Sequence, residues 1–334
     1  MNAKPINTSN QRRTITKLLA LTVLAGIGCV GVAHAETYPS KPITLVVPYP
    51  AGGANDMLGR LIGQKLSEGL GQQLIIDNKP GAGTLIGATV VAKAAPDGYT
   101  LLVGGFASNA VSPVLFKAEY DPLTAFEPIG MFGTAPTILI TYPASPYKTI
   151  KDVVDAAKKK PGEVMYGSSG NGSPLHMSGE MFTAQAGINM THVPYKGGSA
   201  HILDLIGGRL DVIFDTSTNS TSLIKGSKVR PIAVSSKARL PDFPDVPTFT
   251  ESGYPDFSVN GWYALYAPAK TPKEITARLS AELQKVLKMP DVIEKLRGVG
   301  VTPGTGDPQE LAKYGPSEFE KYTKLIKAAN IKAD

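Results

Sequence analysis

Four loops rich in glycine and hydroxyl residues contain the groups best suited to bind an anion. They span residues 49–54, 81–84, 168–173 and 195–199, and each lies between an expected strand and an expected helix. The first turn of a helix leaves backbone N–H groups unpaired and carries partial positive charge, so several helix starts together can bind an anion without arginine. Tight turns and helix caps explain any one of these loops equally well, but four of them favour an anion-binding site.

The candidate ligand-binding residues come from these loops and from the ends of nearby strands. They are Tyr49, Pro50, Ala51, Gly52, Gly53, Gly83, Thr84, Phe106, Ser168, Ser169, Ser173, His176, Lys196 and Asp215. Tyr49 and Phe106 would form walls for an apolar ligand body. His176 could donate to the ligand or cap its own helix, and Lys196 could pair with a carboxylate or stay solvated. Asp215 could cap the following helix or accept a donor from the ligand.

The sequence contains little that could support catalysis. Beyond residue 35 the only histidines are His176, His192 and His201, and there is no cysteine, so no cluster of metal ligands is evident. The segment GSSGN at 167–171 lacks the last glycine of a serine-hydrolase elbow, and the glycines within 81–87 are spaced one residue too widely for a dinucleotide fingerprint. We therefore expect no enzyme, no catalytic residue, no metal and no cofactor. The alternative is a secreted α/β hydrolase or transferase that uses a loop serine or His176.

The N-terminus has the pattern of an export signal. Residues 1–17 are polar and basic, residues 18–32 are apolar but too short for a comfortable membrane span, and Ala-His-Ala at 33–35 suits a signal peptidase. We expect cleavage after Ala35 and a periplasmic mature chain; a retained membrane anchor is the alternative. Two adjacent arginines in the basic region leave both the Sec and the twin-arginine routes open.

Removing this signal changes what the charge implies. The precursor has a formal net charge of +6, and four of its basic residues but none of its acids lie within 1–35, so the mature chain carries +2. The high isoelectric point therefore gives no reason to expect a nucleic-acid partner. The single cysteine, Cys29, is removed with the signal, so the mature chain has no disulfide.

Short apolar runs alternate with amphipathic segments, which is typical of α/β units with a mostly parallel sheet. Asp56 lies at the start of the first expected helix and is more readily interpreted as an N-terminal helix acid than as a ligand contact. The expected strands are 41–48, 73–77, 99–104, 136–142, 164–167, 191–194, 211–214, 229–235 and 262–267. The expected helices are 55–70, 84–95, 150–159, 174–186, 200–206, 273–287 and 308–328.

This alternation falls into two blocks, which predicts two lobes. The segments 130–140 and 258–265 lack the alternation, and we interpret them as two chain crossings between the lobes. The expected organisation is a signal peptide at 1–35, a first lobe of 36–133 plus 262–334, and a second lobe of 134–261. Trp262 then fits hinge packing better than a stacking platform. One continuous sheet in a single large domain is the alternative.

Short motifs in a fixed order along the mature chain carry a family resemblance. They are YPSKPI at 38–43, VPYPAGG at 47–53, DNKPGAG at 77–83, APDGYTL at 95–101 and HVPYKG at 192–197, followed by the segments 241–249 and 262–268. Together they resemble the extracytoplasmic receptors of tripartite tricarboxylate transporters, also called Bug (Bordetella uptake) receptors.

The resemblance implies a two-lobed periplasmic-binding-protein fold of the Venus flytrap, type II-like kind that closes over a carboxylate. It implies that the loops at 49–53 and 81–84 hold a carboxylate group, largely through backbone groups and bridging waters. It also implies that the loops at 168–173 and 195–197 and the residues around Asp215 close from the other lobe and set selectivity.

The ligand itself does not follow from the resemblance. Family members often have glycine where this chain has Thr84, and a hydroxyl there could contact the ligand or narrow the site. We expect an aromatic or aliphatic dicarboxylate, because no cluster of arginines is available for a tricarboxylate. The resemblance further implies membrane permease subunits as partners. We expect a monomer, and a signalling role stays open beside transport.

Overall fold

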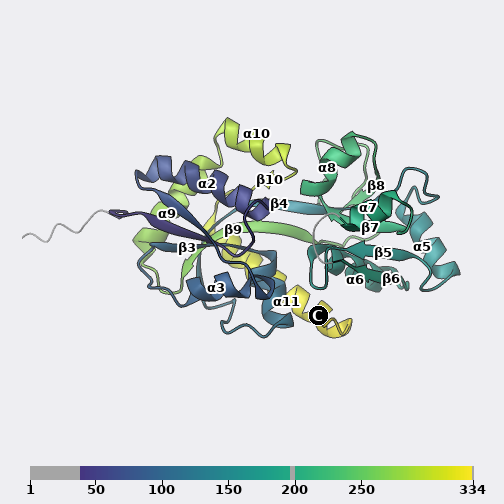
Figure 1. Ribbon diagram of the computed structural model, residues 1–334, viewed down its shortest axis with the longest axis horizontal. Coiled ribbons are helices and arrows are strands. Elements are labelled where there is room, and N and C mark those ends of the chain that lie inside the picture. Colours follow the sequence, from purple (N-terminus) through teal and green to yellow (C-terminus); the bar gives the residue numbers. More distant parts are fainter. Residues whose placement is uncertain (1–37, 196–199, 333–334) are drawn as a thin grey trace, which may run out of the picture. The chain divides into compact units, whose positions relative to one another are not determined.

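The N-terminal block of the chain forms three parallel strands with helices between them. Figure 1 shows the computed structural model, which describes residues 38–195 and 200–332; the expected signal peptide therefore lies outside the described residues. The elements are β1 (Ile43–Val47), α2 (Ala54–Leu70), β2 (Leu74–Asn78), the 3-10 turn η1 (Ala82–Thr84), α3 (Leu85–Ala92) and β3 (Thr100–Gly105). Strand β1 pairs in parallel with both β2 and β3. Leu58, Ile62 and Leu66 form the buried face of α2, at the spacing that an amphipathic helix requires.

The middle of the chain repeats this arrangement around a second set of strands. The π-helical turn η2 (Ala107–Val111) and α4 (Ser112–Leu115) follow β3, and η2 packs beside β3, within the first group. The second set then comprises β4 (Phe126–Thr141), α5 (Ile150–Lys159), β5 (Met165–Ser168), α6 (Pro174–Ala186), β6 (Thr191–Pro194), α7 (Ala200–Ile206), β7 (Val212–Thr216), α8 (Ser217–Lys225) and β8 (Arg230–Val234). Strand β5 pairs in parallel with β6 and β7. Phe182 on α6 packs against Phe214 on β7 and Phe249, which places an aromatic core beneath this sheet.

The C-terminal segment returns to the strands of the N-terminal block. It forms β9 (Asn260–Pro268), α9 (Lys273–Val286), α10 (Pro290–Gly298), β10 (Thr302–Pro303) and α11 (Pro308–Ala328). Strand β9 runs antiparallel between β3 and β4, and α9 packs on α2 and β4. The expected return of the C-terminal helices to the first block is therefore seen in the packing (Figure 1).

Strand β4 belongs to both groups of strands. Its residues up to Pro136 pair with β9, and from Thr137 onward it pairs with β7 and β8. The hydrogen-bonded path therefore runs without a break in the order β2-β1-β3-β9-β4-β7-β5-β6. The change of partners falls inside the segment 130–140, which we expected to cross between the lobes. The two groups of strands predicted from the sequence are therefore joined in one continuous hydrogen-bonded sheet. The lobe boundaries themselves stay a prediction.

Three helical segments escaped the sequence interpretation. Helix α8 is rich in Ser, Thr and Asn, which are poor helix formers and typical of loops. Helix α10 is short and follows α9 after only a few residues. The turn η2 and helix α4 are too short to show a regular spacing of apolar residues. Within the described residues, no helix is both long enough and apolar enough to cross a membrane.

Candidate functional site

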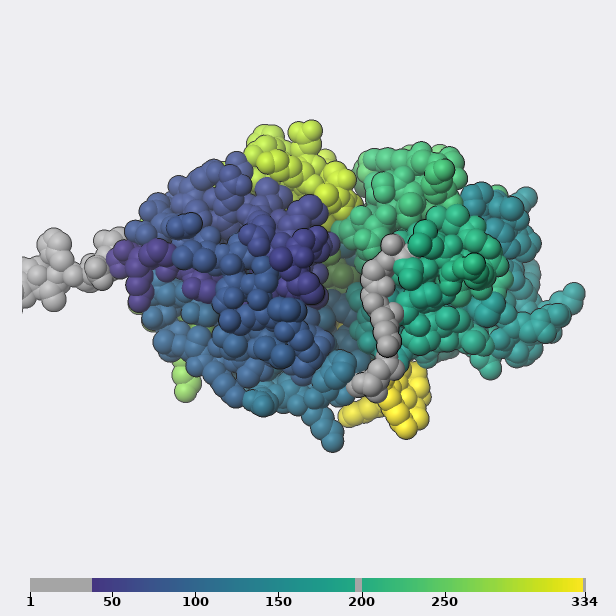
Figure 2. Space-filling model, viewed as in Figure 1, coloured from purple at the N-terminus to yellow at the C-terminus, as the bar shows by residue number. Residues whose placement is uncertain are grey.

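A solvent-open cleft with about 1400 Å³ of free volume lies where the ends of the strands from both groups meet. Figure 2 shows the groove between the parts coloured blue and green. The cleft is lined by turns, helix starts and aromatic side chains, namely Pro48, Tyr49, Pro50, Ala54, Asn55, Pro80, Gly81, Gly83, Thr84, Phe106, Ala107, Ser112, Phe116, Ser169, Asn171, Gly172, Ser173, Pro174, Leu175, Thr216, Thr218, Asn219, Gly261, Trp262 and Tyr263. None of these described residues carries a charge.

The starts of several helices contribute to this lining. Ala54 and Asn55 open α2, Pro174 opens α6, and Thr218 belongs to the first turn of α8. The first backbone N–H groups of a helix have no partner within the helix and attract negative charge. The cleft can therefore bind an anionic group through dipoles, although its described lining contains no basic side chain.

Asp56 fixes the loop that precedes α2. Its carboxylate accepts hydrogen bonds from the Gly52 N–H and from Asn78 Nδ2, both at 2.9 Å, and from Arg60 Nε at 3.0 Å. The hydrogen bond from Arg60 is the main reason that the pKa of Asp56 is lowered to about 2. Asn78 also donates to the Tyr49 carbonyl. Asp56 is buried and outside the cleft lining, so it acts as the structural acid that the sequence favoured.

The turn at 81–84 has an unusual backbone. Gly81, Ala82, Gly83 and Thr84 all have positive φ, at 123°, 46°, 60° and 88°. Such a φ is an outlier for a β-branched residue, yet Thr84 adopts it and is buried. Its Oγ1 atom has no hydrogen-bond partner among the described residues. A side chain at Gly83 would meet the ring of Phe116 at 2.7 Å, so glycine leaves space at the wall of the cleft.

Aromatic rings form much of the remaining wall. Phe106 precedes η2, Phe116 follows α4, and Trp262 and Tyr263 belong to β9. All four line the cleft together with Tyr49. Burial raises the pKa of Tyr263 to about 12, so its hydroxyl stays protonated at neutral pH. Trp262 belongs to the hydrophobic core and also lines the cleft. Its Nε1 atom is buried without a hydrogen-bond partner in the described part of the chain. The wall therefore suits a ligand with an apolar body.

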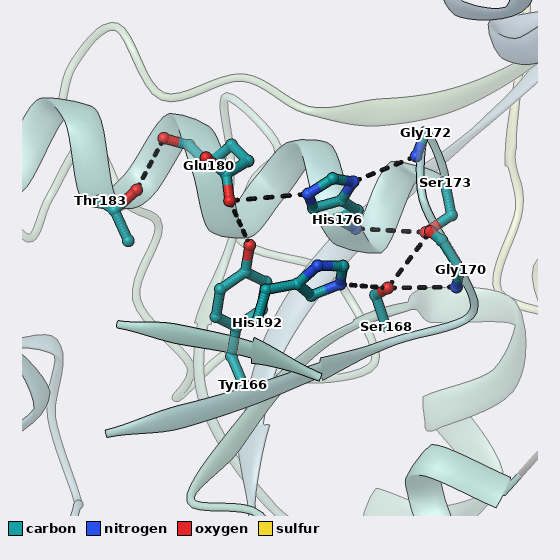
Figure 3. Close-up of polar contacts among 9 residues, drawn as sticks. All are labelled: Tyr166, Ser168, Gly170, Gly172, Ser173, His176, Glu180, Thr183 and His192. Atoms are coloured by element: carbon teal, nitrogen blue, oxygen red, sulfur yellow. Dashed lines mark hydrogen bonds and ion pairs between the residues drawn. The ribbon is translucent and has the colours of Figure 1, made fainter. Parts of the chain in front are cut away.

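A cluster of polar side chains supports the loop 168–173 from behind (Figure 3). Ser168 Oγ lies 2.7 Å from His192 Nε2 and accepts from the Gly170 N–H at 3.1 Å. The rings of His192 and His176 stack with their centroids 4.0 Å apart. Ser173 caps α6 by accepting from the His176 N–H. Ser168 and His176 are buried and lie outside the cleft lining, so they position the loop.

Asp215 has a similar supporting position below α8. It is fully buried in β7 and accepts from the Thr216 N–H at 2.9 Å, from Ser220 Oγ at 2.9 Å and from Asn219 Nδ2 at 3.2 Å. Its carboxylate also lies 3.9 Å from His201 Nε2. Of the two interpretations open from the sequence, this geometry favours ordering of the helix start over contact with a ligand.

The structure thus separates the predicted site residues into two groups. Those in the cleft lining are Tyr49, Pro50, Gly83, Thr84, Phe106, Ser169 and Ser173. Those outside it are Ala51, Gly52, Gly53, Ser168, His176 and Asp215; the first three are exposed and the last three are buried. Lys196, with most of the loop 195–199, lies outside the described residues.

The sequence interpretation missed several residues of the lining. Thr216 ends β7, and Thr218 and Asn219 follow it. Their hydroxyl and amide groups are the same signal that identified the other loops. Ser112 and Phe116 gave no such signal, because they lie at the two ends of a helix too short to show a hydrophobic periodicity. Trp262 was interpreted as hinge packing alone, whereas it also lines the cleft.

The geometry gives no support to metal or serine catalysis. No group of three or more His, Cys, Asp or Glu side chains that could hold a metal ion occurs in 38–195 and 200–332. Ser168 is within hydrogen-bond distance of His192, but it is fully buried behind the loop, away from the cleft lining. A nucleophile must reach the substrate, so this pair does not form a hydrolytic site.

Comparisons with known proteins agree on one family. The model of the family described as "Tripartite tricarboxylate transporter family receptor" matches residues 58–331. A protein from the tcbD–tcbE intergenic region of Pseudomonas sp. strain P51 is 36% identical, over 93% of this chain and 95% of its own length. Protein BugT of Bordetella pertussis is 31% identical, over 95% of this chain and 99% of its own.

Solved structures of similar proteins have the same fold. A protein of R. palustris determined with adipate is 35% identical, has a TM-score of 0.77, and covers 88% of this chain and 99% of its own. MatC from Rhodopseudomonas palustris, determined with bound malate, is 30% identical, has a TM-score of 0.74, and covers 86% of this chain and 100% of its own. The expected α/β periplasmic-binding-protein fold is therefore confirmed.

Proposed function

The chain belongs to the tripartite tricarboxylate transporter receptor family, and on that premise we propose that its cleft captures a small organic carboxylate for delivery to a membrane permease. The family is one of receptors and not of enzymes, so the hydrolase or transferase alternative has no support. Members of the family act in the periplasm. Cleavage of the signal after Ala35, a monomeric state and recognition by particular permease subunits are parts of this proposal.

One observation carries the proposal: helix starts from both groups of strands face an uncharged cleft. The start of α2 and the turn before α3 come from the first group, and the starts of α6 and α8 come from the second. Residues of each of these starts line the same space, and the partial positive charge at the start of a helix suits a carboxylate. A ligand bridging the two groups would favour closure of the second lobe over the first.

The lining favours a dicarboxylate with an apolar middle. Two related proteins were determined with adipate and with malate, which are both dicarboxylates. Rings of Phe106, Phe116 and Trp262 would pack against the ligand body, while the helix starts at either side bind its charged ends. An aromatic carboxylate fits the same wall, and a tricarboxylate would lack a basic partner among the described lining residues.

The lobes would be 36–133 with 262–334, and 134–261. Strands β4 and β9 connect them, and both cross near the point where β4 changes partners. Residues Pro136 and Asn260 pair at this point. A small change of backbone angles in two neighbouring strands would let one lobe swing relative to the other, as hinge closure requires.

A thermal-shift screen of the mature chain tests the proposal. We expect mono-, di- and tricarboxylates to raise the melting temperature to different extents, with a dicarboxylate or aromatic carboxylate giving the largest shift. Mass spectrometry after incubation should recover that ligand unchanged. Turnover of the ligand, or the absence of a shift with every carboxylate while an uncharged solute binds, would contradict the proposal.

A further inference from the structure

The loop 170–173 depends on one histidine for its shape. The Gly172 N–H donates to His176 Nδ1 at 3.1 Å, and the His176 N–H donates to Ser173 Oγ at 3.2 Å (Figure 3). Because Nδ1 accepts a hydrogen bond, it carries no proton, and the neutral ring holds its proton on Nε2. The side chain of His176 is only 7% exposed, so bulk water does not readily replace this bond.

The opposite edge of the same ring faces a carboxylate. His176 Nε2 lies 3.6 Å from Glu180 Oε1, and the Tyr166 hydroxyl donates to that oxygen at 2.6 Å. Burial alone raises the pKa of Glu180, but the contacts with His176 and Tyr166 outweigh it and the pKa is lowered. An ionised Glu180 favours a charged imidazole at His176, whereas the Gly172 N–H favours a neutral one. The contacts at the two edges therefore favour opposite protonation states of the ring.

A second imidazole covers the face of the first. The planes of His176 and His192 differ by 5°, and Tyr166 stacks on His192 in turn. Two parallel imidazoles at this distance resist being charged together. Ser168 Oγ can either donate to or accept from His192 Nε2, so a proton on that atom does not break the contact. A proton on His176 Nδ1 does, because it would face the Gly172 N–H.

The loop supported by His176 touches the other group of strands. Gly172 has φ 75°, and a side chain there would collide with Leu115 on α4. Asn171, Gly172 and Ser173 also line the cleft. The hydrogen bond to His176 therefore orients a segment that both faces the ligand and makes a contact across the cleft.

We infer that His176 is a positioning residue whose neutral ring holds the loop 170–173 in the form that captures the ligand, so that protonation of this ring weakens binding. This inference rests on the proposed function. The titratable groups that face the ring are Glu180 from α6, His192 from β6 and, through Glu180, Tyr166 from β5. Binding requires the neutral form, so protonation of this ring lowers the affinity for the ligand.

Two matched variants isolate this effect. His176→Asn places an amide oxygen near the position of Nδ1 and cannot become charged, whereas His192→Gln keeps a polar atom near Nε2 and removes only the second imidazole. The measured quantity is the affinity of the wild type for adipate divided by that of His176→Asn. Between pH 7.5 and 5.5 this ratio should fall by about threefold to tenfold, which corresponds to the loss of one hydrogen bond. Taking this ratio cancels the titration of adipate itself. In His192→Gln the affinity should still fall with pH, although the removal of the second imidazole can change the pH at which it falls.

Nitrogen NMR of the wild-type chain without ligand gives a second reading. At pH 7.5 we expect His176 to show an unprotonated Nδ1 and a protonated Nε2, together with a protected Gly172 amide. At pH 5.5 the protection of that amide, corrected for the intrinsic exchange rate, should fall. A pH-independent ratio, a profile abolished by His192→Gln, or a protonated Nδ1 at pH 7.5 would overturn the inference. If adipate binds at neither pH, adipate is not a ligand of this cleft, and the protection of the Gly172 amide still decides the role of His176.

Discussion

The hydroxyl of Ser217, the first residue of α8, donates to the Gly300 carbonyl at 2.5 Å in the turn between α10 and β10. Gly300 has a left-handed φ of 72°, and a Cβ atom there would overlap the backbone of Ser217. Thr216 and Thr218, on either side of Ser217, line the cleft. The C-terminal part of the chain thus fixes the position of a helix start that lines the cleft.

Substitution Gly300→Ala should therefore weaken both stability and binding. The new side chain is strained by the positive φ and must push α8 away, so the free energy of unfolding in urea should fall by at least about 1 kcal/mol. Gly298→Ala is the matched control, because nothing lies within 4 Å of a Cβ atom there. The control should change stability by less than about 0.5 kcal/mol. Equal effects of the two substitutions would refute the close contact.

Asp56→Asn should remove stability in a pH-dependent manner. The folded pKa of Asp56 is about 2, below its ordinary value of 3.8, chiefly because Arg60 donates to it. The ionised form therefore stabilises the fold fully above about pH 4, and this contribution is lost as the pH falls toward 2. At pH 7 we expect the variant to be about 1 to 2 kcal/mol less stable, an amount reduced because Arg60 is half exposed.

Urea unfolding at several pH values checks this expectation. The difference between the wild type and Asp56→Asn should be constant from pH 7 to 5 and should shrink between pH 4 and 3. A difference of the same size at pH 3 as at pH 7 would mean that the charge of Asp56 does not hold the loop 49–54.

Thr84→Gly should make the unliganded chain more stable. The substitution relieves a φ of 88° and removes a buried hydroxyl without a partner among the described residues. These gains exceed the added chain entropy of glycine, so we expect a net increase of about 1 kcal/mol. Thr84→Ser separates the two causes, since it keeps the hydroxyl and removes only the β-branch. A loss of stability in Thr84→Gly would show that the hydroxyl makes a stabilising contact.

Lys321→Met should destabilise the fold more than the same substitution of a lysine on the surface would. Lys321 Nζ donates to the Ser258 carbonyl at 2.7 Å and to Glu318 Oε1 at 2.6 Å. Burial raises the pKa of Glu318 more than Lys321 lowers it, so the pKa lies above its ordinary value. Without Lys321 the buried acid loses its partner, which should cost about 2 kcal/mol. Adding Glu318→Gln to the variant should restore most of the loss in urea unfolding; no recovery would indicate that the bond to Ser258 dominates.

The elements with strong end signals could be predicted from the sequence alone. Helix α5 begins and ends where expected, because Thr149 and Asp152 form a capping box. Helix α6 also matches, since Ser173 caps it and proline follows. Helix α8 could not be recognised, because its Ser, Thr and Asn residues are typical of loops and its first residue is held by Gly300, which is 83 residues away in sequence.

The site was predictable in its position and less so in its individual contacts. The expected mostly parallel sheet is in fact mixed, because β4 and β9 run antiparallel to their neighbours. Within each group, however, β1 is parallel to β2 and β3, and β5 is parallel to β6 and β7. The turns after these strands therefore lie at one edge, which is why Tyr49, Thr84 and Ser173 meet at the cleft. Whether a polar side chain faces the cleft or supports a loop depends on its neighbours in space. Ser168 and Ser169 are adjacent in sequence, yet only Ser169 lines the cleft, because Ser168 is bonded to His192.

Trp262 is the only tryptophan of the chain and lines the cleft, so its fluorescence reports directly on the site. The decisive measurement is a titration of the mature chain with adipate and related carboxylates while this emission is followed. A saturable change whose midpoint agrees with the dissociation constant from calorimetry is the predicted result. Calorimetric binding that leaves the Trp262 emission unchanged would place the ligand elsewhere and contradict the account.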